Sequence, residues 1–192
     1  IEKLKTLNRT YLILGIFALL VAVFYGKTLF NGFVLDDRPV IVENPYVQSF
    51  EHLPRVFTGC IWEAALGGCE GRTLHYRPFA TLSYLLTWQI SSSPWVFHLV
   101  NLVYFFGAVS LVFFVVKLLT RDFGVSFLTA LFFLVHPINN EAVSWISAAA
   151  DLLLALFSLL SVYFYVQFRK TNESQKLLLV LLFYLFAMLS KE

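Results

Sequence analysis

Two adjacent carboxylates follow the first hydrophobic stretch of the chain, in the segment FVLDDRPVI at residues 33–41. Successive side chains diverge by about 100° on a helix and alternate on a strand, so Asp36 and Asp37 cannot both point at one atom. One could act as a proton-accepting base, while the other orients a substrate group, opposes ionisation of the first by like-charge repulsion, or binds a metal. Oxygen ligands alone would favour Mg²⁺ or Mn²⁺, although two carboxylates do not require a metal. The structural alternative is a loop cap or a pairing with Arg38.

Three basic residues outside the hydrophobic stretches suit a phosphate oxyanion: Arg72, Arg77 and Lys191. Arginine can bind such an anion through two hydrogen bonds at once. The alternative for each is structural pairing or contact with a lipid headgroup. A carboxylate base together with phosphate-binding cations at a membrane surface indicates chemistry on a lipid-linked phosphate.

Five further polar residues lie close to the ends of hydrophobic stretches and are supporting candidates: His98, Asn101, His136, Glu141 and Asp151. Ionisable groups at membrane depth are costly and often functional. Four of them also have a plain structural explanation, which is hydrogen bonding between helices for His98 and Asn101, a cap for His136 and an ion pair for Asp151. What favours function is that all of them are expected on one side of the membrane.

The composition predicts an all-α, polytopic transmembrane helix bundle. The 192 residues are 59% hydrophobic, 14% charged and include 21 Phe, more apolar surface than a soluble core can bury. About 20 helical residues span the roughly 30 Å hydrocarbon core, and five apolar stretches approach this length: about 11–30, 95–119, 123–137, 142–168 and 177–190. The first stretch lacks the small-residue cleavage site of a signal peptide, which favours an anchor. A net charge of +2 without a basic stripe excludes nucleic acid as a partner.

Charge asymmetry predicts the orientation of these spans. Eight of the fourteen basic residues fall in the N-terminus and in the turns at 117–122 and 169–176, together with only three acidic residues. Positive charge favours the cytoplasm, so we expect these three segments there. The long loop at 31–93 and the turn at 136–141 then lie outside, which means the periplasm, the extracellular space or the lumen of the endoplasmic reticulum.

The external loop is expected to be ordered. Cys60 and Cys69 would pair in an oxidising compartment, and otherwise they are two free loop thiols. SFEHLPRVF places Phe50, Leu53 and Phe57 near one helical face, and RPFATLSYLLTWQI opens with proline and is too short to span. Both segments predict amphipathic helices at the membrane interface, above the external mouth of the bundle.

Four motifs in order, FVLDD, YRPFATLSYLLTWQISSSPWVFHLVN, HPINNEAVSWISAAADLL and LSKE, resemble the membrane part of GT-C glycosyltransferases that carry C-terminal tetratricopeptide repeats. That family includes transmembrane O-mannosyltransferases that target cadherins, and bacterial relatives. The resemblance implies an inverting transfer of a sugar, such as mannose, from a polyprenyl- or dolichyl-phosphate donor to a Ser or Thr hydroxyl of a protein acceptor. It also implies that residues 1–192 form one N-terminal fragment of a longer membrane domain, inactive alone.

The resemblance assigns roles to individual residues. Asp36 would be the general base within an acidic motif shared with Asp37, while Arg77 in Y-R-P and Lys191 in S-K-E would hold the donor phosphate. The turn from His136 to Glu141 matches H-P-x-x-x-E, and Asp151 matches the Asp of S-x-R-x-D.

Two positions depart from the family pattern. Ala149 stands where relatives usually carry Arg, and Phe105 stands where many carry His. Donor binding would then depend on Arg72 or Lys191. The departures leave open a non-catalytic scaffold or pseudoenzyme, and a transporter or flippase is the remaining alternative.

Overall fold

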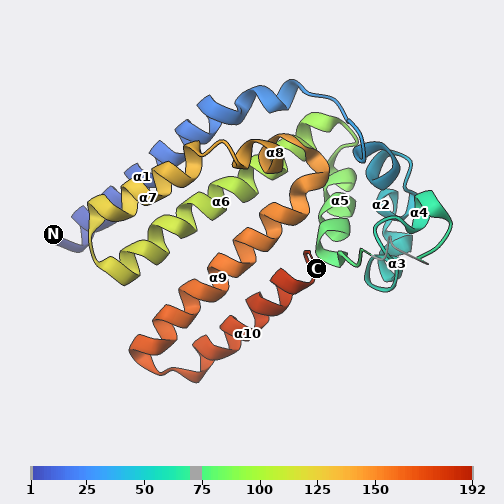
Figure 1. Cartoon of the computed structure of the whole chain (residues 1–192). Helices are drawn as coiled ribbons and strands as arrows, with labels where there is room; N and C mark the ends of the chain where they lie inside the picture. Colours follow the sequence, from blue (N-terminus) through green and yellow to red (C-terminus); the bar gives the residue numbers. More distant parts are fainter. Residues whose placement is uncertain (1, 70–74, 192) are drawn as a thin grey trace.

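The chain folds into a bundle of long helices with a cluster of short helices at one end (Figure 1). The computed structural model describes residues 2–69 and 75–191. Within them, three helical stretches are long and apolar enough to cross a membrane: Arg9–Phe30, Pro94–Thr120 and Ile146–Thr171. The prediction of an all-α membrane bundle is therefore confirmed.

Two further apolar helices, α7 (Phe123–Val135) and α10 (Ser174–Met188), run alongside the long ones. At 1.5 Å per residue they are about 20 and 23 Å long, shorter than the roughly 30 Å hydrocarbon core. The expected total of five spans therefore remains a prediction.

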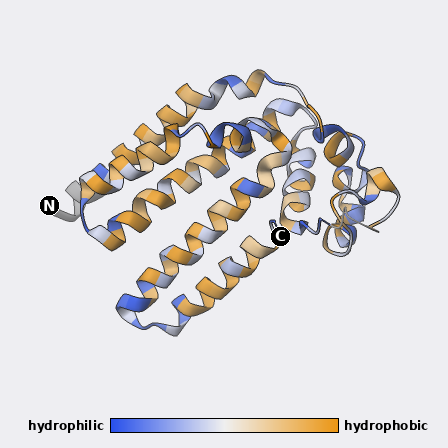
Figure 2. Cartoon of the chain, in the orientation of Figure 1, coloured by the Kyte–Doolittle hydropathy of each residue, from blue (hydrophilic) through white to orange (hydrophobic). Residues whose placement is uncertain are grey.

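The long helices differ in direction. α1 (Glu2–Tyr25) continues into the 3₁₀ turn η1 (Gly26–Phe30), and α6 (Pro94–Thr120) runs back against it. α9 (Ala149–Thr171) runs in the same direction as α6 and opposite to α1 (Figure 1). Helix α6 contacts α1, α7 and α9, while α10 packs on α9. Hydrophobic residues dominate the bundle, and polar residues concentrate at its two ends (Figure 2).

Aromatic side chains hold α1 in the bundle. Ile13, Phe17, Val21 and Tyr25 recur every four residues on one helical face, and all four are buried. The Tyr25 hydroxyl donates a hydrogen bond to the carbonyl oxygen of Leu134 over 3.0 Å. The first apolar stretch is thus an integral part of the core.

Residues 31–93 form what we call the cap, and the end of the bundle that carries it is the cap end. In residues 31–69 and 75–93 the structure has six short helices: η2 (Arg38–Val42), α2 (Pro45–Gln48), η3 (Phe50–His52), α3 (Leu53–Thr58), α4 (Glu63–Leu66) and α5 (Pro78–Ile90). Val40, Ile41 and Val47 form with Tyr84 a second buried cluster beneath it. Cys60 and Cys69 are joined by a disulfide.

Both helices expected in the external loop are present, as η3 with α3 and as α5. The apolar face expected on the first of them points outward, because Phe50, Leu53 and Phe57 are 52, 37 and 44% exposed. An exposed aromatic face of this kind fits the interfacial role predicted for this segment.

The fourth predicted span differs at its start. The sequence predicts a continuous helix from Ala142, but the structure forms the short helix α8 (Asn139–Ser144) and the 3₁₀ turn η4 (Ile146–Ala148), and α9 begins only at Ala149. Hydrogen bonds from distant side chains, described below, hold the chain in this interruption. Asp151 consequently lies in the first turn of α9, not several turns inside it.

Candidate functional site

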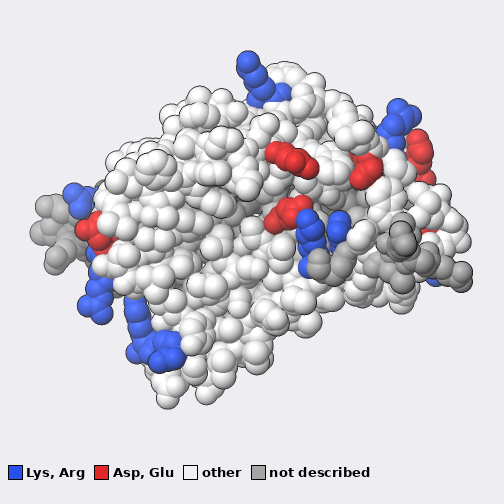
Figure 3. Space-filling view, viewed as in Figure 1, with Lys and Arg blue, Asp and Glu red and all other residues white. Residues whose placement is uncertain are grey.

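A cavity of about 180 Å³ lies at the cap end, beside the start of α9. Five predicted site residues line it, contributed by the cap, α8, α9 and the segment after α10: Asp36, Arg77, Glu141, Asp151 and Lys191. A neighbouring cavity of about 310 Å³ shares Glu141, Asp151 and Lys191 with it. Figure 3 shows acidic and basic side chains gathered near this end of the bundle.

The two adjacent aspartates have different surroundings. Asp37 is fully buried, and its Oδ1 accepts hydrogen bonds from the backbone N of Ser147 at 2.9 Å and from the Ser147 hydroxyl at 2.5 Å. Its Oδ2 accepts one from the backbone N of Val34 at 2.9 Å. Three donors leave Asp37 little capacity for another partner, which makes it a structural acceptor.

Asp36 is half-buried and lines the cavity. Within the described part of the chain, no hydrogen bond or ion pair engages its carboxylate, and its backbone carbonyl accepts a bond from Val40 N at 3.0 Å. Leu35, just before it, has a φ of 48°, in a region that a bulky residue rarely adopts. This left-handed turn comes directly before the two aspartates, of which Asp36 lines the cavity and Asp37 bonds to Ser147.

Residues 145–147 form a hub that fixes the cavity wall. The Asn101 side chain on α6 donates to the carbonyl of Trp145 over 3.0 Å, and the Tyr84 hydroxyl on α5 donates to the carbonyl of Ser147 over 3.0 Å. With the bonds to Asp37, three side chains from three parts of the chain hold this short segment. They supply the local hydrogen bonds that a continuous helix would otherwise make within itself.

Tyr84 keeps its proton and donates a hydrogen bond to the carbonyl of Ser147 in this arrangement. Burial, reinforced by the negative charge of Asp37, raises the pKa of its hydroxyl above the ordinary value for tyrosine. Sequence reasoning missed both Tyr84 and Ser147, because an apolar helix with one Tyr and a run of small residues carry no chemical pattern.

Asp151 and Lys191 form an ion pair across the cavity, with Lys191 Nζ 2.5 Å from Asp151 Oδ1. Both side chains keep substantial exposure, at 42 and 33%. The segment before Lys191 is held against the cap by a hydrogen bond, which the backbone N of Phe79 in the first turn of α5 donates to the carbonyl of Leu189 over 3.2 Å. The structural pairing weighed for Asp151 is thus present, and the pair still faces the cavity.

The start of α9 contributes a second source of positive potential. Ser147, Ala148 and Asp151 of this region line the cavity, and the N-terminal end of a helix carries a partial positive charge. Together with Arg77 and Lys191, it places positive charge that suits an anion such as a phosphate on one side of a cavity that Asp36, Glu141 and Asp151 also line.

Among the described residues, the other predicted candidates do not line the cavity. His98 is 1% exposed in α6, and neither ring nitrogen has a hydrogen-bond partner among the described residues. His136 is exposed after α7, where its Nδ1 accepts from Ile138 N at 3.2 Å. Asn101 is part of the hub, and Arg72 lies outside the described residues.

The two departures from the family pattern are buried in the structure. Ala149 is 1% exposed and belongs to the core cluster beneath the cap, so it does not line the cavity. Phe105, also 1% exposed, packs its ring 5.1 Å from that of Tyr25.

Over the described residues, no group of three or more His, Cys, Asp or Glu side chains is placed to hold a metal ion.

Comparison with known proteins finds several protein O-mannosyl-transferases that are similar to this chain. The mouse "Protein O-mannosyl-transferase TMTC3" is 34% identical over 155 residues, which is 80% of this chain and 17% of that protein. The Caenorhabditis elegans "Protein O-mannosyl-transferase F38B6.6" is 30% identical over 161 residues, 82% of this chain and 23% of that protein. The human "Protein O-mannosyl-transferase TMTC1" is 36% identical over 146 residues, 73% of this chain and 16% of that protein.

The chain therefore spans less than a quarter of the length of each of these relatives. No family model and no solved structure matches it.

Proposed function

Because the chain is homologous to the protein O-mannosyl-transferases of the TMTC group, we propose that it builds part of a glycosyltransferase site. The reaction is the transfer of mannose from a polyprenyl- or dolichyl-phosphate donor to a Ser or Thr hydroxyl of a protein. The observation that carries the proposal is the cavity lined by Asp36, Arg77, Asp151 and Lys191.

The donor phosphate is assigned to the positive side of this cavity. Lys191 offers an ammonium group at the cavity wall, Arg77 contributes a guanidinium, and the start of α9 adds its partial charge. Because position 149 is alanine, the S-x-R-x-D segment offers no arginine here, and these groups supply the positive charge instead. An ammonium and a guanidinium in one small cavity suit the charge of a phosphodiester.

Asp36 is the proposed general base. Its carboxylate takes the proton of the acceptor hydroxyl as that oxygen forms a bond to the anomeric carbon, and the bond from this carbon to the lipid phosphate breaks on the opposite face. The configuration inverts, and the phosphate leaves with the bonding electron pair as a monoester anion. Base assistance of this kind contributes about 10²–10⁴-fold to the rate.

Asp37 is a positioning residue in this scheme. It ties the segment before Asp36 to Ser147 and so holds the base against the wall of the cavity at the start of α9. We place the cap and the site on the external face of the membrane, since the opposite end of the bundle carries the excess of basic residues.

A transport path is less well supported. Buried hydroxyls between the two ends of the bundle bond to helix backbone, with Ser110 donating to Phe106 O and Ser161 to Val180 O. A substrate path requires polar groups that are available to the substrate.

The decisive test replaces the proposed base. Asp36→Asn, introduced into the full-length protein that contains this segment, should lower mannose transfer in membranes by about 10²–10⁴-fold, because the amide cannot accept the proton. The measurement is transfer of radiolabelled mannose from the lipid donor to an acceptor peptide. Glu43→Gln is the matched control, since Glu43 is an exposed cap carboxylate paired with Arg38, and it should keep full activity. Full activity in Asp36→Asn would remove the assigned mechanism.

A further inference from the structure

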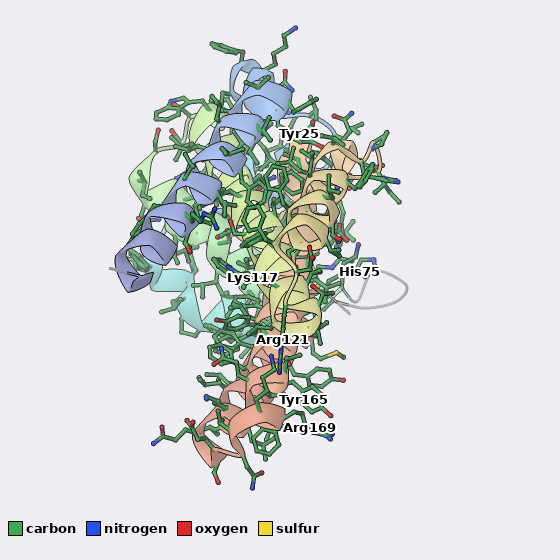
Figure 4. All side chains as sticks on the ribbon, turned by 90° about the vertical axis from the view of Figure 1, so that its left-hand side faces the viewer. Tyr25, His75, Lys117, Arg121, Tyr165 and Arg169 are labelled. Carbon is green, nitrogen blue, oxygen red and sulfur yellow. A yellow bond between two sulfur atoms is a disulfide. The ribbon has the colours of Figure 1, made fainter. Side chains whose placement is uncertain are left out.

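The end of the bundle opposite the cap, which we call the basic end, contains a second pocket of about 380 Å³. Its wall combines three cationic and three apolar or aromatic side chains from the end of α6, the turn after it and the end of α9: Lys117, Arg121, Lys170, Phe114, Leu118 and Tyr163. Figure 4 looks onto this end, with Lys117, Arg121 and Arg169 labelled.

The cations of this pocket are not neutralised by acidic residues. In the described part of the chain, neither Lys117 nor Arg121 nor Lys170 forms an ion pair. The two described acids nearby in sequence are engaged elsewhere, since Asp122 caps α7 through Val125 N at 2.8 Å and Glu173 pairs with Lys176 at 3.0 Å.

Local contacts position the side chains of the two lysines and the backbone of Arg121, and they leave the three charged groups able to bind an anion. Lys170 Nζ donates to the carbonyl of Leu118 over 2.5 Å, which leaves two of its three N–H groups. Lys117 Nζ lies 5.5 Å from the ring centre of Phe113. Arg121 occupies the left-handed position after α6, with φ 59°, and its backbone N closes the helix on Lys117 O at 3.0 Å.

The position of the pocket points to a lipid. Two candidate membrane spans, Pro94–Thr120 and Ile146–Thr171, end beside it, so it lies at the level where these helices leave the hydrocarbon. Large apolar side chains next to the pocket are exposed, with Leu119 at 62%, Val162 at 44% and Tyr165 at 45%. A phosphate on the cations would place acyl chains over this apolar surface.

We propose that the pocket between the ends of α6 and α9 binds the phosphate headgroup of an anionic phospholipid. This site is separate from the cavity at the cap end and does not depend on the function proposed for it. Its role would be to fix the depth and tilt of α6 and α9 in the membrane.

The test is a titration of the detergent-purified protein with phosphatidylglycerol, with phosphatidylcholine as the neutral lipid, followed by native mass spectrometry. Arg121→Asn should weaken phosphatidylglycerol binding about fivefold, and a second change, Lys117→Gln, should weaken it by a similar factor again. Asparagine tolerates the left-handed backbone at position 121, so the first variant removes charge without backbone strain.

Arg169→Gln is the matched control, because Arg169 is an exposed basic residue at the same end of α9 but outside the pocket. It should change binding less than twofold. Equal losses in Arg169→Gln and Arg121→Asn, or equal affinity for the two lipids, would overturn the proposal. Millimolar inorganic phosphate should compete only weakly, and its displacement of the lipid would identify a free phosphate as the ligand and refute a lipid site. If the double variant does not fold, the comparison of the two single arginine variants decides.

Discussion

Asp36 and Asp37 are neighbours in sequence, but Asp36 lines the cavity while Asp37 is buried and hydrogen-bonded. We therefore assign the proposed chemistry to Asp36 and a structural role to Asp37. The sequence alone predicts that one aspartate acts and the other supports it, because their side chains must diverge. It could not predict which, since the assignment depends on Ser147, which lies 110 residues further along the chain. Asp36, Arg77, Glu141, Asp151 and Lys191 could be nominated by charge and position, whereas Tyr84 could not, because its role comes from the carbonyl it contacts.

Asp37→Asn should destabilise the protein by about 2–3 kcal/mol, because an amide replaces a charged acceptor and turns an N–H toward backbone donors. The measurement is thermal unfolding in detergent. Asp36→Asn serves as the comparison and should leave the unfolding temperature nearly unchanged, since its carboxylate faces the cavity. Equal destabilisation by the two changes would contradict the division of roles.

Tyr84→Phe should remove a component of the alkaline sensitivity of the fold. The pKa of Tyr84 is raised in the folded state, so the folded protein keeps this proton while the unfolded chain loses it above about pH 10. This contribution to stability is present below pH 10 and is lost as the pH rises further. Unfolding temperatures measured between pH 8 and 11 should therefore fall less steeply in Tyr84→Phe than in the unchanged protein, and parallel curves would contradict the prediction.

At the scale of elements, the interruption between α8 and α9 is the feature that builds the site. It brings Ser147 and Ala148 to the cavity and places Asp151 in the first turn of α9. The segment AVSWISAAAD contains neither Gly nor Pro, so nothing in the local sequence marks a break, and a continuous helix was the natural prediction. The break is imposed by tertiary hydrogen bonds, which a hydrophobic pattern does not encode. By contrast, α5 and α6 each begin with proline and were predictable at their starts.

Asn101→Ala should lower the free energy of unfolding by about 0.5–1.5 kcal/mol, because the carbonyl of Trp145 loses its side-chain donor and keeps only the bond from Ala148 N at 3.2 Å. Mannose transfer should fall as well, since the hub positions the cavity wall. Ser110→Ala on the same helix is the control and should cost under about 0.5 kcal/mol, because Ser110 bonds only to its own helix. A loss no greater in Asn101→Ala than in this control would show that the hub does not depend on Asn101.

At the scale of the whole molecule, hydropathy and charge were enough to predict a helical membrane bundle with two chemically different ends. They did not show that α6 is the central helix, because its apolar residues are distributed around its whole circumference and indicate no preferred neighbour. The two pockets lie at opposite ends of α6 and α9, so both helices connect the proposed transfer site with the proposed lipid site.

The ion pair between Asp151 and Lys191 gives the proposed site an internal counterion. A donor phosphate that binds Lys191 would compete with the carboxylate of Asp151 for the same ammonium group. This competition would lower the affinity for the donor and would speed release of the lipid phosphate, because Asp151 can pair with Lys191 again as the phosphate leaves. In the proposed reaction, Asp151 therefore competes with the lipid phosphate for Lys191 and shortens the time that this product stays bound.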